Sequence, residues 1–319
     1  MTEIARAADF LRAGELVAFP TETVYGLGAD ARNPHAIARI FAAKGRPADH
    51  PLIVHLPDAS HLERWAIDIP AAAGRLAAAL WPGPLTLILK RHPDVPDAVT
   101  GGQDTVGLRV PDHPLALQLL REFGGGVAAP SANRFGRVSP TTAAHVREEL
   151  GDAVAMIVDG GPCAVGIEST ILDLSGTEVR ILRPGMLDAK AIATVLGYVP
   201  EFGGAQNAPR VSGSLEAHYA PGTELQLVAA ADLAATAQRG LADGRRIAVL
   251  AAPPFASEPP GIVWFPASAD PVRFAHDLYA NLRELDALGR DLILVAAPPD
   301  EEAWRAVSDR LRRAAAGSK

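Results

Sequence analysis

Two cationic side chains, Lys44 and Arg46, lie one residue apart at the end of a predicted helix. Because like charges this close repel each other, an anion bound between them, either a carboxylate or a triphosphate, would explain the pair. The alternative is that Lys44 complements the negative end of the helix dipole. A polar loop with Thr23 precedes the helix and an apolar strand with His55 follows it. These neighbours favour the anion site.

Arg109 lies inside an otherwise apolar predicted strand. A charge in such a strand costs free energy unless it is paired or lies at the surface. Two interpretations therefore stay open: a surface residue on an edge strand, or a clamp for the carboxylate of a substrate. Buried arginine is uncommon, so the sequence alone does not decide between them.

Hydroxyl, amide and cationic side chains also lie where later strands begin or end. Ser131 and Asn133 follow a strand, and ligands of open α/β sheets usually bind at the carboxyl ends of strands. Both residue types are also common in turns. Ser139 precedes a proline, which favours a helix cap but also suits phosphate binding at a helix start. Ser169 lies in a polar turn that enters a strand, and Arg183 leaves another strand.

Composition and missing motifs argue against several classes of protein. The formal net charge of −7 disfavours a broad electrostatic grip on nucleic acid. His50, His55 and His218 are too scattered for a metal-ligand spacing, so we expect no protein-held metal. No GxSxG elbow or P-loop motif supports a serine hydrolase or a P-loop enzyme. A single cysteine, Cys163, predicts a packed thiol and a cytoplasmic location, and we expect neither a membrane span nor a secretion signal.

Apolar periodicity and turn residues divide the first part of the chain into short strands and helices. Asn33 before Pro34 is a typical helix start and Gly45 a typical helix end, whereas 21–28 is expected to be a loop. Strands and helices do not alternate strictly, which predicts an α/β fold with a mixed twisted sheet flanked by helices. The expected strands are 16–19, 52–56, 85–89, 105–110, 127–129, 153–158, 170–174 and 179–182, and the main expected helices are 2–12, 34–44, 70–80, 114–123, 139–151 and 188–196.

A stretch rich in proline and glycine, 199–222, lacks periodicity and predicts a linker between two domains. It separates a first domain of residues 1–198 from a small Rossmann-like α/β domain of residues 223–319. The second domain has four expected strands and three expected helices, but no glycine-rich phosphate loop or other catalytic motif.

A series of sequence blocks, in this order and spacing, resembles one family. They are FPTETVYGLGADA, the KGRP that follows it, HPLIVHL, WPGPLTLIL, TVGLRVPDHP, APSANRFGRVSPT and GIESTILDL with RILRPG. Together they resemble the YrdC-like domain of L-threonylcarbamoyladenylate synthases over most of residues 5–198. HYAP at 218–221, followed by a small α/β domain, resembles the two-domain form of that enzyme.

This resemblance implies a nucleotidyltransferase that joins L-threonine, bicarbonate and ATP into threonylcarbamoyl-AMP and releases pyrophosphate. Mg²⁺ is expected on the triphosphate. The product would pass to a separate threonylcarbamoyl transferase complex that modifies the adenosine beside the anticodon of tRNAs. Direct binding of tRNA is not expected to dominate.

The resemblance also implies roles for individual residues. The catalytic group around the phosphates and the carbamate would be Lys44, Arg46, Ser131 and Asn133. The threonine contacts would be Thr23, His55, Arg109, the Ala129 backbone and Ser169. The nucleotide contacts would be Arg46, His50, Thr105, Ser131, Ser139, Arg183 and, from the linker, Tyr219.

Two other functions compete with this one. The concave basic surface of YrdC-like domains resembles an RNA-binding surface, so a binding module without catalysis is the main alternative, although the net charge of −7 disfavours it. Carbamoyl transfer, as in hydrogenase-maturation proteins with this domain, would be accompanied by zinc-finger cysteines or an acylphosphatase segment. The chain shows neither.

Overall fold

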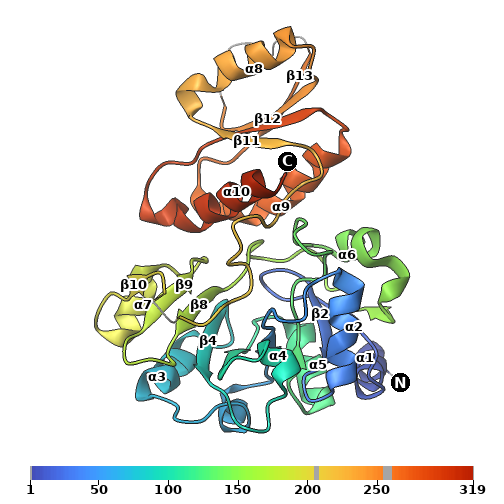
Figure 1. The fold of residues 1–319 in the computed structure, drawn as a ribbon, viewed down its shortest axis with the longest axis vertical. Coiled ribbons are helices and arrows are strands. Elements are labelled where there is room, and N and C mark those ends of the chain that lie inside the picture. The colour runs from blue at the N-terminus through green and yellow to red at the C-terminus, as the bar shows by residue number, and fades with distance from the viewer. Residues whose placement is uncertain (1, 205–207, 254–260, 319) are drawn as a thin grey trace. The chain divides into compact units, whose positions relative to one another are not determined.

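The computed structural model describes residues 2–204, 208–253 and 261–318, which form two compact units with separate sheets (Figure 1). The first unit comprises Met1–Phe135 and Ser139–Ser214, and the second comprises Gly136–Val138 and Leu215–Lys319. The predicted linker is thus divided between the units at residue 214. Within the described ranges, no helix is long and apolar enough to cross a membrane.

Among the described residues, the first unit contains one sheet of ten strands in the order β10-β9-β8-β4-β5-β3-β6-β2-β1-β7. Its centre mixes parallel pairs, such as β3 with β5, and antiparallel pairs, such as β4 with β5. The predicted mixed sheet is confirmed. The strands are β1 Val17–Phe19, β2 Gly26–Asp30, β3 Ile53–His55, β4 Leu85–Lys90, β5 Thr105–Arg109, β6 Val127–Ala128, β7 Met156–Ile157, β8 Thr170–Asp173, β9 Arg180–Arg183 and β10 Glu201–Phe202.

Helix α2, Pro34–Lys44, begins and ends at the predicted signals. The Asn33 side chain accepts hydrogen bonds from two amides of the first turn, and Gly45 ends the helix with a φ of 61° in the left-handed region. This ending directs the chain from Lys44 toward β3. The other helices of the unit are α1 Glu3–Arg12, α3 Ala71–Leu80, α4 Asp97–Thr100, α5 Pro114–Phe123, α6 Ala143–Leu150 and α7 Ala189–Leu196, with 3-10 helices η1 Ala59–Arg64 and η2 Gly151–Ala153.

The loop expected at 21–28 is shorter than predicted. Gly26–Asp30 forms strand β2, which pairs with β1 on one side and with β6 on the other. Gly28 permits this close approach, because a Cβ atom there would lie 2.8 Å from the Phe19 ring. Glycine was therefore wrongly interpreted as a loop signal at this position, where it allows tight strand packing.

The helix expected to begin at residue 139 begins four residues later. Helix α6 is capped by Thr142, whose hydroxyl accepts a hydrogen bond from the His145 amide. Ser139 is fully buried and is not a cap. The cap interpretation of Ser139 is thus wrong, because a hydroxyl closer to the helix takes that role.

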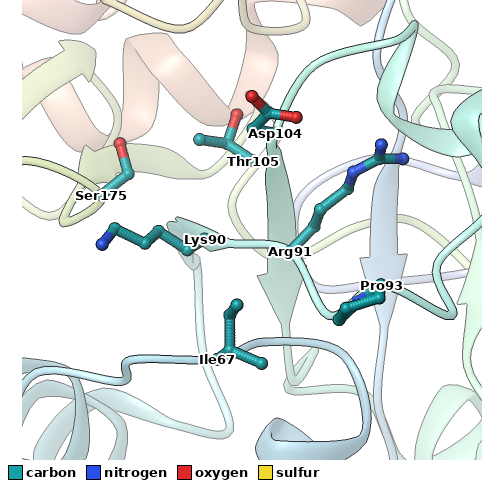
Figure 2. Close-up of a pocket in the computed structure, with 7 residues that line it drawn as sticks. All are labelled: Ile67, Lys90, Arg91, Pro93, Asp104, Thr105 and Ser175. Atoms are coloured by element: carbon teal, nitrogen blue, oxygen red, sulfur yellow. The ribbon is translucent and has the colours of Figure 1, made fainter.

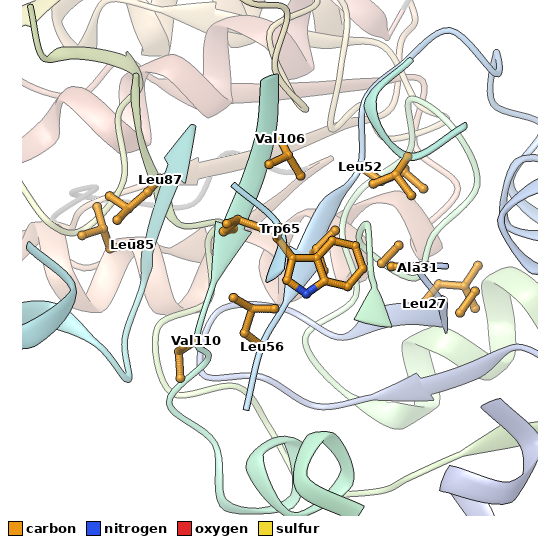
Figure 3. Packing of buried hydrophobic residues seen from close by; sticks show 14 of the residues in the cluster. Leu27, Ala31, Leu52, Leu56, Trp65, Leu85, Leu87, Val106 and Val110 are labelled. Atoms are coloured by element: carbon orange, nitrogen blue, oxygen red, sulfur yellow. The ribbon is translucent and has the colours of Figure 1, made fainter. Parts of the chain in front are cut away.

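The core of the first unit consists mainly of small aliphatic side chains around Trp65 (Figure 3). Figure 3 shows the Trp65 indole among Leu52, Leu56 and Val106. The packing leaves no spare room, since a Cβ atom on Gly126 would lie 2.3 Å from the indole. Such dense packing fixes the spacing of the strands that carry the polar side chains described below.

The second unit has, in its described part, a four-stranded parallel sheet in the order β11-β14-β12-β13. Figure 1 shows α8 on one face of this sheet and α9 and α10 on the other. The predicted small α/β domain is confirmed. Its elements are β11 Leu225–Val228, η3 Ala230–Asp232, α8 Leu233–Ala242, β12 Ile247–Ala251, β13 Ile262–Pro266, α9 Pro271–Ala287, β14 Leu292–Ala296, η4 Glu302–Trp304 and α10 Arg305–Gly317.

The second unit also holds three residues from the middle of the chain, Gly136–Val138. The Gly136 carbonyl accepts a hydrogen bond of 2.8 Å from the Ala220 amide. Arg137 forms an ion pair of 3.1 Å with Asp286 of α9. This short segment follows Asn133 and precedes Ser139 in sequence, so contacts of the second unit adjoin two predicted site residues.

Candidate active site

Strands β3 and β5 place His55 and Arg109 side by side, because the two residues are register partners. Their exposed fractions are only 3% and 4%. β5 pairs with β3 on one side and with β4 on the other. Arg109 is therefore on an interior strand, and the interpretation as an edge-strand surface residue is wrong.

The loop between β1 and β2 brings a hydroxyl and a carboxylate to Arg109. The guanidinium donates a hydrogen bond of 2.9 Å to the Thr23 hydroxyl, and its Nη2 atom lies 2.7 Å from the Glu22 carboxylate. The Thr21 hydroxyl holds the loop by donating to the Val24 carbonyl at 2.6 Å. A buried cation, anion and hydroxyl thus meet from two parts of the chain.

His55 is electrically neutral at physiological pH. Burial and the positive charge of Arg109 lower the pKa of His55 to about 3, and the nearby Ile53 backbone opposes this shift only partly. The ring lies edge-on to Phe19 with a centroid distance of 6.0 Å. Within the described residues, its Nδ1 atom makes no hydrogen bond. A neutral imidazole with a free nitrogen can bind a hydroxyl group.

Lys44 is also buried, with an exposed fraction of 4%, and its ammonium donates to the carbonyl oxygens of Ser131 and Asn133. Burial and the nearby Arg46 cation hold the pKa of Lys44 well below its usual value. The ammonium thus binds a different loop and not the end of its own helix. Dipole complementation alone therefore does not account for its position.

Two arginines predicted to bind the nucleotide contact the same residue, Ser212. Arg46 donates to the Ser212 hydroxyl at 3.3 Å and to the Pro51 carbonyl at 2.9 Å. Arg183 is buried and donates to the carbonyl oxygens of Ser212 and Ser169, each at 2.9 Å. A residue of the predicted linker is thereby part of the same polar cluster.

Two predicted hydroxyl contacts, Ser139 and Ser169, are buried in the same unit. Ser139 donates to the Glu168 carboxylate at 2.7 Å. The Ser169 hydroxyl lies 2.8 Å from that of Thr86 and accepts a hydrogen bond of 3.1 Å from Arg183. Glu168 and Ser169 are consecutive, so one turn carries both sets of contacts.

His50 and Ala129 lie in different surroundings from these groups. The His50 ring contacts the Phe135 ring edge-on at a centroid distance of 5.4 Å, and burial followed by the Arg46 charge lowers the His50 pKa. The Ala129 amide donates to the Ile53 carbonyl at 3.0 Å. The Ala129 amide is thus engaged within the sheet.

Thr105 begins β5 and lines a pocket of about 520 Å³ with charged and polar neighbours (Figure 2). The register partner of Thr105 on β4 is Lys90. In Figure 2, Lys90 and Ser175 lie on one side of the labelled group and Arg91 lies on the other. The pocket carries charges of both signs, because Asp104 also lines it. The role of Thr105 in nucleotide binding stays a prediction.

Tyr219 belongs to the second unit and is almost fully buried there. Its φ is 61°, which is uncommon for a residue other than glycine. The ring packs on Tyr279 at 5.7 Å, and the Arg310 guanidinium lies 5.4 Å from its centroid. The predicted contact of Tyr219 with the nucleotide likewise stays a prediction.

Sequence reasoning missed Glu22, Glu168 and Ser212. The first two directly precede the predicted contacts Thr23 and Ser169, so a carboxylate beside a candidate contact was the available signal. Ser212 had no such signal, because the path of an aperiodic segment depends on tertiary contacts.

Neither a metal cluster nor a reactive thiol is found in the described part of the chain. There, no group of three or more His, Cys, Asp and Glu side chains could hold a metal ion. Burial raises the pKa of Cys163 to about 12, so this residue is a protonated, packed thiol.

The fold and these side chains define a two-unit α/β protein whose first unit buries cations, carboxylates and hydroxyls around its central strands. A family model described as "Telomere recombination" matches residues 9–185, and one described as "Threonylcarbamoyl-AMP synthase, C-terminal domain" matches residues 187–316. The threonylcarbamoyl-AMP synthase of Bacillus subtilis is 42% identical, over 99% of this chain and 93% of the relative. The chain therefore belongs to the threonylcarbamoyl-AMP synthase family in its two-domain form.

Solved structures agree with this assignment. Pyrococcus abyssi Sua5 complexed with L-threonine matches with a TM-score of 0.90 and 38% identity, over 99% of this chain and 94% of that one. A variant of the same Sua5 matches with a TM-score of 0.91 and 37% identity, over 99% and 93% of the two chains. The similarity thus extends across both units.

Proposed function

We propose that this chain joins L-threonine, bicarbonate and ATP into threonylcarbamoyl-AMP and releases pyrophosphate, with the residues named below. The synthase activity itself follows from family membership over nearly the whole length of the chain. The observation that carries the residue assignment is the buried Arg109–Thr23 contact beside neutral His55. A cluster of buried polar side chains with a strongly shifted pKa is typical of a site that binds a polar ligand.

The threonine subsite is proposed around Arg109. Its guanidinium would bind the substrate carboxylate, because arginine matches carboxylate geometry with two parallel donors. Thr23 and neutral His55 would bind the substrate hydroxyl, and Ser169 and the Ala129 backbone would complete the contacts. The complex of a relative with L-threonine supports this assignment.

The nucleotide subsite is proposed around Arg46 and Arg183, with His50, Thr105, Ser131, Ser139 and Tyr219 as further contacts. Both arginines donate a hydrogen bond to Ser212. Nucleotide phosphates would take over the guanidinium hydrogen bonds that Ser212 now accepts. We therefore expect the segment around Ser212 to change its contacts when ATP binds.

The chemistry needs charge neutralisation more than a strong base. A carbamate formed from threonine and bicarbonate is already a nucleophile, and its oxygen attacks the α-phosphorus of ATP. The bond from that phosphorus to the bridging oxygen breaks, and pyrophosphate leaves with the electron pair. Because both reactants are anions, Lys44 and Arg46, with Ser131 and Asn133, would hold them together and stabilise the developing charge. Mg²⁺ would be bound by the triphosphate of ATP.

Pyrophosphate release by the purified full-length chain tests this function. We expect release only when ATP, L-threonine and bicarbonate are all present, and loss when any one is omitted. A protein that bound neither ATP nor threonine and released no pyrophosphate would contradict the proposal. Serine in place of threonine is a suitable control, because it lacks only the methyl group.

The product is proposed to pass to a separate transferase complex that modifies tRNA. Threonylcarbamoyl-AMP is a mixed anhydride, which explains the need for direct use by a downstream enzyme. The alternative of an RNA-binding module is not supported by the relatives, which share the synthase name. A salt-sensitive affinity for tRNA without pyrophosphate release would be needed to restore it.

A further inference from the structure

Glu22 is a buried ionisable residue next to the proposed threonine subsite. Its exposed fraction is 5%, close to the 4% of Arg109. One carboxylate oxygen of Glu22 lies 2.7 Å from Nη2 of Arg109, and the two side chains form an ion pair. Within the described residues, neither oxygen of Glu22 makes a hydrogen bond of good geometry.

Unused hydrogen-bonding capacity is concentrated around this pair. Among the described residues, Nε of Arg109 and Nδ1 of His55 also lack hydrogen-bond partners. A buried ion pair stabilises a protein only when its remaining donors and acceptors are satisfied. Three neighbouring side chains with unsatisfied atoms therefore indicate a site prepared for a polar ligand.

The charges of this group match those of an amino acid. An α-amino acid carries one carboxylate and one ammonium, and the pair offers one guanidinium and one carboxylate. The proposed contacts Thr23, His55, Ser169 and Ala129 supply no negative charge for the ammonium. Glu168, which directly precedes Ser169, is also a buried carboxylate. It already accepts a hydrogen bond from Ser139.

We propose that Glu22 binds the α-ammonium of L-threonine while Arg109 binds its carboxylate. This inference rests on the proposed function. Threonine then replaces the Glu22–Arg109 ion pair, because its ammonium binds Glu22 and its carboxylate binds Arg109. Specificity for an amino acid over a hydroxy acid resides in Glu22.

The test compares two ligands on two proteins by isothermal titration calorimetry. The ligands are L-threonine and (R)-3-hydroxybutyrate, which has the same carboxylate and hydroxyl but no ammonium. The proteins are wild type and Glu22→Gln. We expect the substitution to weaken threonine binding roughly 10- to 100-fold, as for other charged hydrogen bonds, and to leave 3-hydroxybutyrate binding unchanged or tighter.

Two results would overturn the proposal. Equal weakening of both ligands would mean that Glu22 only positions Arg109, and unchanged threonine binding would mean that Glu22 does not contact the substrate. If the variant does not fold, wild type alone still decides, because similar affinities for the two ligands would show that no group binds the ammonium.

A matched control is Glu15→Gln, which removes a carboxylate paired with Arg39 at the surface, outside the polar cluster. We expect its threonine affinity to equal that of wild type. ATP binding by Glu22→Gln checks that the variant is folded. Failure of the proposed function can be told apart from failure of the Glu22 proposal, because in the first case the wild-type protein would bind no threonine at all.

Discussion

The two units place very different side chains at the ends of their central strands. In the second unit, the carboxyl ends of parallel strands surround a cavity of about 670 Å³ lined by alanines, prolines and the aromatic rings of Phe274 and Trp304. In the first unit, β3 and β5 end in the buried residues His55 and Arg109, and the buried Lys44 ends helix α2. The strand ends of the second unit thus surround an apolar cavity, whereas those of the first unit carry buried cationic and imidazole side chains.

Buried charge is nevertheless not sufficient to identify a site. Arg310 of the second unit is fully buried, yet it forms an ion pair of 2.8 Å with Asp309 and lies over the Tyr219 ring. Its charge is neutralised within the fold. Among the described residues, neither Arg310 nor Asp309 has a buried side-chain polar atom without a hydrogen-bond partner, whereas Arg109 and Glu22 both do. The unsatisfied atoms distinguish a binding site from a structural ion pair.

The comparison predicts the largest effect for Lys44→Ala in the first unit. Loss of a preorganised cation commonly lowers a rate about 10²- to 10³-fold, and two contacts to the Ser131–Asn133 loop are lost as well. Pyrophosphate release under saturating substrates measures this effect. The control is Lys190→Ala, which removes an exposed lysine on α7. Near-wild-type turnover in Lys44→Ala would contradict the catalytic assignment.

Trp304→Ala tests whether the second cavity is structural. The buried indole packs on Phe274 at a centroid distance of 5.5 Å, so we expect a loss of about 3–5 kcal/mol in the free energy of unfolding of the second unit. Calorimetric melting of the full chain measures it, with the exposed Val272→Ala as control. The Michaelis constant for threonine should not change. A large rise would contradict the view that the second cavity is structural.

Asp286→Asn tests the segment 136–138, because Asp286 holds this segment within the second unit through its ion pair with Arg137. Its carboxylate accepts hydrogen bonds from Arg137 and from the amides of Gly222 and Thr223. We expect a loss of about 1–3 kcal/mol in the free energy of unfolding. The exposed Glu284→Gln on the same helix is the control.

The kinetics of Asp286→Asn decide whether the units are functionally independent. Since segment 136–138 lies between Asn133 and Ser139, we expect the Michaelis constant for ATP to rise more than that for threonine. Equal changes in the two constants would indicate a general loss of folded protein. No kinetic change would leave Asp286 with a purely structural role.

The smallest effect is expected from the titration of His55. The pKa of His55 is about 3 in the folded protein, and its usual value, expected in the unfolded chain, is 6.5. Between pH 3 and pH 6.5, the unfolded chain therefore binds more protons than the folded protein. Stability therefore falls as pH falls below 6.5, by about 1 kcal/mol between pH 6.5 and 5.5. Urea unfolding at both pH values should show a loss about 1 kcal/mol smaller in His55→Asn than in wild type. A remaining loss is expected in both proteins, because the pKa values of His50 and His113 are also lowered. The exposed His35→Asn should retain the wild-type dependence.

Much of the local structure could be predicted because its causes are local. Asn33 and Gly45 set the limits of α2 through capping and a left-handed ending, and both were predicted. Gly28 was misinterpreted, because the same residue type serves loops and tight strand packing. Ser139 was misassigned as a cap for a similar reason: a hydroxyl before a proline fits several structures.

The sequence by itself determined the α/β class, the two-part organisation, and most of the residues that carry charge into the first unit. Tertiary structure alone decided that Arg109 is interior, that it faces Glu22, and that Lys44 reaches the Ser131–Asn133 loop. The physical reason is that capping and periodicity act between near neighbours in the chain. Burial and charge pairing depend on strand order, which joins residues far apart in sequence.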